Sequence, residues 1–119
     1  MKRLICTAML GLAIPACGQP GTGPRYCPDA NRMVDAIWHA EGGNRAKIPY
    51  GILAVRVHST SEARSVCLVT VQRALARWRA TGTQDNAVEF VSNTYCPVSC
   101  DPVGHWNWIR NVKWFLNHP

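Results

Sequence analysis

Helix start and stop signals divide the chain after residue 27 into four amphipathic stretches. Three of them begin with side chains that cap a helix: Asp29, Ser59 and Asp101. Asp101 is followed by Pro102 at the first helical position, where proline is favoured. Residues that end a helix follow three of them: Gly42-Gly43, Gly82 and Cys96-Pro97. Inside each stretch the apolar residues recur at three- and four-residue spacing, which predicts a mainly α-helical domain.

One segment interrupts this helical pattern. Residues 44–58 lack helical spacing, contain Pro49 and Gly51, and include a run of β-favouring residues over 52–57. We therefore expect a short strand or an irregular segment between the first two helices. The third helix is predicted over about 84–93. No internal repeat or second domain boundary is visible, so residues 27–119 are expected to form one small domain and to remain monomeric.

The N-terminal residues have the pattern of a secretory signal peptide. Lys2 and Arg3 precede an apolar stretch over 4–14, and Ala16 supplies a small residue where a signal peptidase could cut. This apolar stretch is too short to span a bilayer as a permanent helix. We expect residues 1–16 to be removed from a bacterial protein that is periplasmic, anchored at the outer membrane or secreted.

Cys17 directly follows Ala16, so residues 14–17 can also be interpreted as a bacterial lipobox in which the cysteine is acylated. Residues 17–26 are rich in glycine and proline and have little to bury, which predicts a flexible lead. This lead suits a lipid anchor at Cys17 as well as an ordinary mature N-terminus, and both interpretations stay open. A membrane is expected as a partner only through that anchor.

The cysteines that remain after signal cleavage predict a disulfide framework. Of six cysteines in the chain, four fall in the predicted domain: Cys27, Cys67, Cys96 and Cys100. An even number in a short exported chain predicts two disulfides, with three possible pairings. Pairing Cys96 with Cys100 and Cys27 with Cys67 is preferred, because the first two are close in sequence. The chain has no C-x-x-C pair, so no metal or other cofactor is expected.

The predicted domain is basic. The chain has a formal net charge of +6 at pH 7, and loss of Lys2 and Arg3 lowers this by two, to +4. A cationic domain is attracted to anionic polymers. No nucleic-acid-binding motif accompanies the basic residues, and the export signal argues against that partner. The charge can therefore serve solubility alone, or it can attract an anionic partner such as cell-wall material or a membrane surface.

Glu41 is the side chain most suited to catalysis. Helical spacing places Val34, Ile37 and Trp38 on the same face, so the carboxyl group should emerge from apolar surroundings. Partial burial and the negative end of the helix dipole both disfavour the charged form of a carboxyl group there. A protonated glutamic acid is what a general acid needs to cleave a glycosidic bond. Helix position alone also allows a solvent-facing glutamate without a catalytic role.

Short motifs around Glu41 resemble the start of a lysozyme-like lytic transglycosylase domain. The sequence AIWHAEGG over 36–43 is followed by PYGIL over 49–53. Glu41 matches the glutamate of that family, Gly51-Ile52 match a Gly-Leu step that lines the glycan cleft, and Tyr50 precedes them. Further on, SNTYCP over 92–97 lies where the family has a tyrosine near the cleft floor, which corresponds to Tyr95. The resemblance spans about residues 30 to 116.

The resemblance implies a lysozyme-like fold and an enzyme, a lytic transglycosylase or a muramidase, that acts on peptidoglycan glycan strands. The bond cleaved would join N-acetylmuramic acid to N-acetylglucosamine, with Glu41 as the single acid/base. Residues expected to contact the glycan are the matched positions and two tryptophans outside the predicted core: Tyr50, Gly51, Ile52, Tyr95, Trp38 and Trp106. The other tryptophans in the domain fit apolar core stripes: Trp78, Trp108 and Trp114.

The chain departs from the family pattern at three places. Gly42 stands where a serine is usual, Ala54 where a glutamine is usual, and the Ala-Tyr-Asn sequence is not intact around Tyr95. These differences concern substrate positioning more than the acid itself. They leave a second interpretation open: an exported or lipid-anchored protein that keeps the lysozyme-like fold and binds the cell wall without cleaving it.

Overall fold

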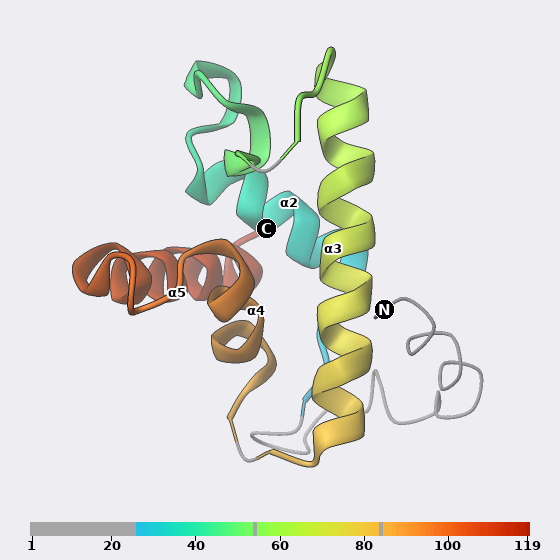
Figure 1. The fold of residues 1–119 in the computed structure, drawn as a ribbon, viewed down its shortest axis with the longest axis vertical. Helices are drawn as coiled ribbons and strands as arrows, with labels where there is room; N and C mark the ends of the chain where they lie inside the picture. The colour runs from blue at the N-terminus through green and yellow to red at the C-terminus, as the bar shows by residue number, and fades with distance from the viewer. Residues whose placement is uncertain (1–25, 54, 84) are drawn as a thin grey trace.

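The computed structural model describes residues 26–53, 55–83 and 85–119, and these residues form a mainly helical domain (Figure 1). Four α-helices make up the fold: α2 (Ala30–Ala40), α3 (Thr60–Thr81), α4 (Ala87–Tyr95) and α5 (Pro102–Asn117). Two short 3-10 helices lie between α2 and α3: η3 (Gly43–Arg45) and η4 (Pro49–Gly51). The prediction of a mainly helical domain is confirmed.

The long helix α3 forms one side of the molecule, and α4 and α5 lie together beside it (Figure 1). The helix α2 packs against both α3 and α5, while α4 fills the space between α3 and α5. Each helix contributes apolar side chains to a single core. Its largest fully buried members include residues of all four of these helices: Met33, Val71, Trp78, Val91 and Val112. Their removal from water is the main stabilising contribution to the fold.

The helices α2 and α3 begin where the sequence predicts. The side chain of Asp29 accepts a hydrogen bond from the backbone N–H of Arg32 at the start of α2. Ser59 accepts from the N–H of Glu62 at the start of α3, and the Glu62 carboxylate accepts from the N–H of His58. Such side chains satisfy backbone donors that have no partner inside the helix. They fix the first turns of α2 and α3.

The segment between α2 and α3 is irregular. No residue described there is in a strand, so the strand over 52–57 is wrong and the irregular alternative is correct. Tyr50 has φ 59° and Gly51 has φ 64°, both in the left-handed region, so the chain turns directly before residue 52. Ile52 itself is extended, but its N–H donates to the carbonyl of Pro49 within this turn and not to a neighbouring strand.

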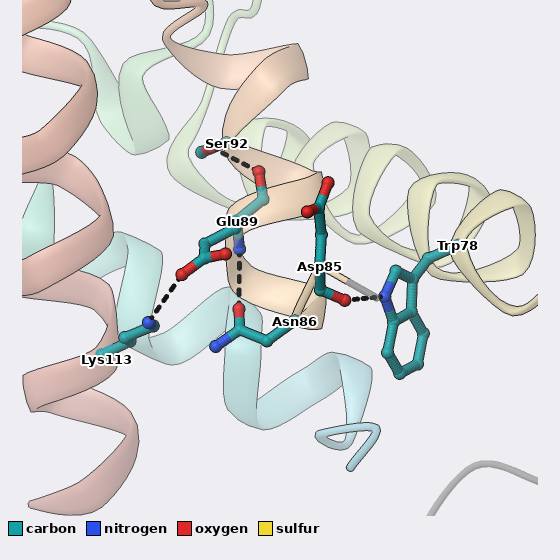
Figure 2. A network of polar contacts seen from close by, with 6 residues as sticks. All are labelled: Trp78, Asp85, Asn86, Glu89, Ser92 and Lys113. Carbon is teal, nitrogen blue, oxygen red and sulfur yellow. Dashed lines mark hydrogen bonds and ion pairs between the residues drawn. The ribbon is translucent and has the colours of Figure 1, made fainter. Parts of the chain in front are cut away.

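At the other end of α3, polar contacts close the turn into α4 (Figure 2). The indole N–H of Trp78 donates to the backbone carbonyl of Asp85 at 2.8 Å, and the Asn86 side chain accepts from the N–H of Glu89 at 2.9 Å. Glu89 also forms an ion pair with Lys113 of α5 at 3.1 Å. Because Asn86 is the cap, α4 begins at Ala87 and not near residue 84, and it extends to Tyr95.

The predicted disulfides among the domain cysteines are not formed, because Cys67, Cys96 and Cys100 are free thiols. The sulfur of Cys27 lies 3.7 Å from the guanidinium of Arg79. Arg79 follows Cys67 by twelve residues of α3, which is about 18 Å along the helix, whereas bridged cysteines need Cα atoms within about 7 Å. Cys96 packs partly against the core while Cys100 is exposed, so their thiols face different surroundings.

The predictions for the N-terminus fall outside the described residues. These are the signal peptide over 1–16, the lipidation site at Cys17 and the flexible lead up to residue 25. Within the part of the chain that the structure describes, none of the helices combines the length and the apolar character needed to cross a membrane.

Candidate active site

Glu41 lies at the C-terminal end of α2. Its backbone N–H donates to the carbonyl of Ile37 at 2.9 Å, which completes the last helical turn. Gly42 follows with φ 110°, in the left-handed region where glycine ends helices without steric cost. The chain therefore turns away directly after Glu41, and the half-buried glutamate side chain leaves the helix at its tip.

The carboxyl group of Glu41 rests on the backbone of Gly51. A Cβ atom added to Gly51 would come within 2.6 Å of Cδ of Glu41 and within 2.8 Å of both carboxyl oxygens. Real Cβ atoms do not approach other heavy atoms so closely, so only glycine leaves room for this contact. The positive φ of Gly51 favours glycine for a second, independent reason.

Trp108 of α5 binds the same carboxyl group through a hydrogen bond. Its indole Nε1–H donates a hydrogen bond of 2.9 Å to Oε2 of Glu41. Trp108 belongs to α5 and is only 7% exposed, so its ring is fixed by the core. Glu41 has no other side-chain hydrogen bond within the described residues. One carboxyl oxygen is thus held by Trp108, while Oε1 makes no side-chain hydrogen bond within the described residues.

Tyr95 lies on the far face of Trp108. The two rings stack with their centroids 5.4 Å apart and their planes 18° apart. The Tyr95 hydroxyl donates to the sulfur of Cys67 on α3 at 2.9 Å. Tyr95 is therefore near Glu41, as predicted, but it reaches the carboxyl group through Trp108 and has its own hydroxyl engaged elsewhere.

The electrostatic effects of these groups agree with their close packing. Burial raises the pKa of the Cys67 thiol to about 11, with Tyr95 and Arg64 acting against this rise and the Glu41 carboxylate adding to it. Burial also raises the pKa of Tyr95, and Cys67 and Glu41 act in the same direction. Both groups therefore stay neutral around pH 7.

Tyr50 and Trp38 form the wall next to Gly51. Tyr50 is only 5% exposed, and its ring lies 5.0 Å from that of Trp38 with a tilt of 43°. Trp38 also packs beside Gly43, directly after the end of α2. Ile52 is partly buried against the core. These predicted residues lie around Glu41, but Tyr50 acts as a buried support and not as an open contact surface.

Trp106 is the predicted site residue that the structure does not bring to Glu41. It precedes Trp108 by two residues on α5, which places the two side chains about 200° apart around the helix. Trp106 is 58% exposed, and its ring makes an edge contact with His105. Its surface is separate from the Glu41 cluster.

Two members of the cluster were missed from the sequence, Trp108 and Cys67. Trp108 shares the apolar stripe of α5 with Ile109 and Val112, so its spacing matches a core residue, and all three are buried. The hydrogen bond to Glu41 spans 67 residues and leaves no local pattern. The tyrosine hydroxyl that faces Cys67 likewise comes from a distant helix.

Two hollows on the described part of the protein lie beside other residues. One of about 410 Å³ is lined by Tyr26, Arg32, Asn86 and Lys113 among others. The second, of about 360 Å³, lies along α2 and α5, and Trp38 is one of its lining residues. Glu41 lines neither of them. The carboxyl group is thus packed into a partly buried corner and not at the base of either hollow.

The remaining carboxylates near the helices are engaged in structural contacts. Four of them cap helices or pair with cations: Asp29, Asp35, Glu62 and Glu89. Asp101 caps α5 through the N–H of Gly104. Within residues 26–53, 55–83 and 85–119, no group of three or more His, Cys, Asp or Glu side chains is arranged to hold a metal ion.

Comparison of the chain with known protein families, curated proteins and solved structures finds no match. The case for a function therefore depends on the motifs around Glu41 and on the geometry of this corner.

Proposed function

We propose that this chain is an exported peptidoglycan-cleaving enzyme with a lysozyme-like fold and Glu41 as its acid/base. The observation that carries the proposal is the seating of the Glu41 carboxyl group, which is fixed on Gly51 and hydrogen-bonded by Trp108. Residues from α2, η4 and α5 converge on this single group. A surface glutamate at a frayed helix end would need none of these contacts.

The arrangement suits general acid catalysis. Trp108 holds Oε2, so the carboxyl group has a fixed orientation and Oε1 can direct a proton toward the glycosidic oxygen. Proton transfer from Glu41 accompanies cleavage of the bond between C1 and the leaving oxygen. The resulting carboxylate then accepts the proton of the muramic 6-hydroxyl as its oxygen bonds to C1, which regenerates Glu41 and gives a 1,6-anhydro product.

A single carboxyl group is sufficient for this route. A hydrolytic enzyme often uses a second carboxylate to place or activate water. The other described carboxylates act as caps or in ion pairs, apart from Asp85. Asp85 precedes α4, at the opposite end of this helix of about 13 Å from Tyr95, whose end of α4 faces the site. The transglycosylase reaction is therefore favoured over hydrolysis.

A second candidate function is wall binding without cleavage. It is favoured by one observation: Glu41 lines neither of the two hollows described above. In this case the fold and the Glu41 contacts would be retained for stability, and the chain would hold glycan strands without breaking them.

Clearing of purified peptidoglycan by Glu41→Gln separates these functions. The amide keeps the shape of the side chain but cannot donate and recover the proton, so we expect cleavage to fall at least about a hundredfold. The matched control is Glu89→Gln, the same chemical change at a half-exposed ion pair, and it should retain activity. Equal clearing by wild type and Glu41→Gln would contradict the proposal, and absence of clearing by wild type would favour the binding function. Mass spectrometry of the products distinguishes 1,6-anhydro ends, which a transglycosylase forms, from reducing ends, which a hydrolase forms.

A further inference from the structure

The helix α5 carries large apolar side chains on the face turned away from the core. Its buried face includes Trp108, Ile109 and Val112. On the other side, Val103 is 71% exposed, Trp106 is 58% exposed and Trp114 is 53% exposed. The prediction that Trp114 belongs to the core is therefore wrong. Large apolar side chains gathered on one exposed face are typical of binding surfaces.

The exposed tryptophans are aligned along the helix. Trp106, Arg110 and Trp114 are four residues apart, so they share one face of α5. Trp106 and Trp114 are separated by two turns, which is about 12 Å along the helix axis. Together with Val103 they form a row that we call the α5 aromatic face.

Both tryptophan rings are held in place by neighbouring aromatic rings. The ring of Trp114 stacks on His118 at a centroid distance of 4.1 Å with an interplanar angle of 13°, and it meets Phe115 edge-on. Trp106 meets His105 edge-on at 4.7 Å. His105 is itself buried and hydrogen-bonded to the carbonyl of Cys96. Supported rings lose little conformational entropy when a flat ligand stacks on them.

The charge of α5 defines the ligand further. Residues 102–119 contain no Asp or Glu, and the cation Arg110 lies between the two tryptophans. Its guanidinium donates a hydrogen bond to the side chain of Asn107 at 2.7 Å, which uses one of its five N–H donors. The remaining donors can bind a carboxylate from the ligand. A ligand that fits this face has flat apolar ring surfaces and carries negative charge.

We propose that the α5 aromatic face is a binding site for an acidic glycan strand, with two sugar rings stacked on Trp106 and Trp114 and a ligand carboxylate paired with Arg110. The identity of the glycan as peptidoglycan rests on the proposed function, but the face lies apart from Glu41 and binds without cleaving. It would keep the protein on an insoluble polymer while the Glu41 corner acts on one bond.

The test is co-sedimentation of the protein with purified insoluble peptidoglycan, measured in the Glu41→Gln background. We expect the combined Trp106→Ala and Trp114→Ala change to weaken binding by about tenfold or more, and Arg110→Ala to weaken it by several-fold. The matched control is Tyr26→Ala, which removes another exposed aromatic ring, 40% exposed, away from α5. Unchanged binding by the double variant would overturn the proposal.

Two further measurements keep the result decisive. Far-UV circular dichroism checks whether the double variant is folded. If it is unfolded, the single variants Arg110→Ala and Trp106→Phe test the proposal instead. We expect Arg110→Ala to lose peptidoglycan binding and Trp106→Phe to retain it. A parallel assay uses anionic phospholipid vesicles, and vesicle binding that is lost in the double variant while glycan binding is kept would overturn the proposal in favour of a membrane surface. Loss of clearing in Glu41→Gln is read separately, so failure of the proposed function and failure of this site are distinguishable.

Discussion

Two buried tryptophans donate hydrogen bonds of nearly equal length at opposite ends of the domain, and their acceptors differ. Trp78 donates to the backbone carbonyl of Asp85 at 2.8 Å, and Trp108 donates to the carboxyl group of Glu41 at 2.9 Å. A backbone carbonyl does not titrate, so the first bond can only fix the turn between α3 and α4. A carboxyl group exchanges protons, so the second bond orients a group that can take part in a reaction.

The backbone is strained at the Glu41 end of the domain and unstrained at the Trp78 end. Near Glu41, Tyr50 has φ 59°, and it is the one non-glycine residue with positive φ among those described. Such a conformation costs an ordinary residue about 1–2 kcal/mol. At the other end, the left-handed position after α3 is occupied by Gly82, which carries no such cost. Local strain is therefore tolerated where it seats the carboxyl group, which is typical of functional sites.

The largest difference between the two ends is expected from alanine substitutions at their glycines. Gly51→Ala combines a positive φ with a Cβ placed 2.6 Å from the Glu41 carboxyl carbon. The positive φ costs a non-glycine residue about 1 kcal/mol, and the Glu41 carboxyl group would have to move off Gly51 and lose its hydrogen bond to Trp108. We therefore expect the free energy of unfolding to fall by about 2–3 kcal/mol, and cleavage to fall with it. Gly82→Ala has φ +69° but nothing within 4 Å of the new Cβ. It should cost only about 1 kcal/mol and leave cleavage unchanged.

Urea unfolding of both variants measures this difference. Equal losses at Gly51 and Gly82 would mean that the Glu41 carboxyl group is not seated on Gly51.

A smaller effect is expected at alkaline pH and is confined to the Glu41 end. The pKa of Cys67 rises from 9.0 to about 11 on folding, so between these values the unfolded chain loses a proton that the folded protein keeps. The free energy of unfolding should therefore fall as pH rises from about 9 to about 11, by on the order of 2 kcal/mol. The raised pKa of Tyr95 extends this loss to higher pH.

Comparing the pH dependence of Cys67→Ala and Cys100→Ala checks this expectation. Cys67 is fully buried and Cys100 is exposed, so the first variant should have the weaker alkaline loss and the second should match wild type. An identical pH dependence in all three proteins would contradict the burial of an un-ionised thiol beside Tyr95.

The smallest effect is expected at the other end, in the network of Figure 2. The ion pair between Lys113 and Glu89 is 3.1 Å long, and both side chains are close to 40% exposed. Exposed ion pairs contribute about 0–1 kcal/mol because water and salt screen them. We expect Lys113→Met to lower the free energy of unfolding by less than about 1 kcal/mol without changing cleavage. A larger loss in the free energy of unfolding would mean that this ion pair stabilises the fold more than an exposed pair is expected to.

Local signals in the sequence were sufficient to predict most of the fold. Asp29, Ser59 and Asp101 cap helices because capping depends on residues within one turn. Asn86 was missed as the cap of α4, because the tryptophan that fixes the preceding turn comes from α3. A strand over 52–57 was one of two alternatives that the β-favouring side chains left open. A strand also needs a neighbouring segment to accept its backbone hydrogen bonds, and side-chain preference alone does not supply one.

The candidate site was predictable only in part. Glu41, Tyr50 and Gly51 belong to short motifs, and they do lie together. Trp108 could not be distinguished from a core residue, since its burial is real and its hydrogen bond depends on tertiary packing. Cys67 was assigned to a disulfide from the number of cysteines alone, which says nothing about the distance between their positions on α3 and elsewhere.

We propose that Trp108 orients Glu41 for proton transfer. This role is tested by measuring the initial rate of peptidoglycan cleavage by folded Trp108→Phe and Trp78→Phe proteins. Each variant loses an indole N–H and about 1–3 kcal/mol of stability. We expect Trp108→Phe to lower the cleavage rate about tenfold or more, because Glu41 loses its orienting hydrogen bond. Trp78→Phe should keep the wild-type cleavage rate per folded molecule. A wild-type rate in Trp108→Phe, or equal losses in both variants, would contradict this role of Trp108.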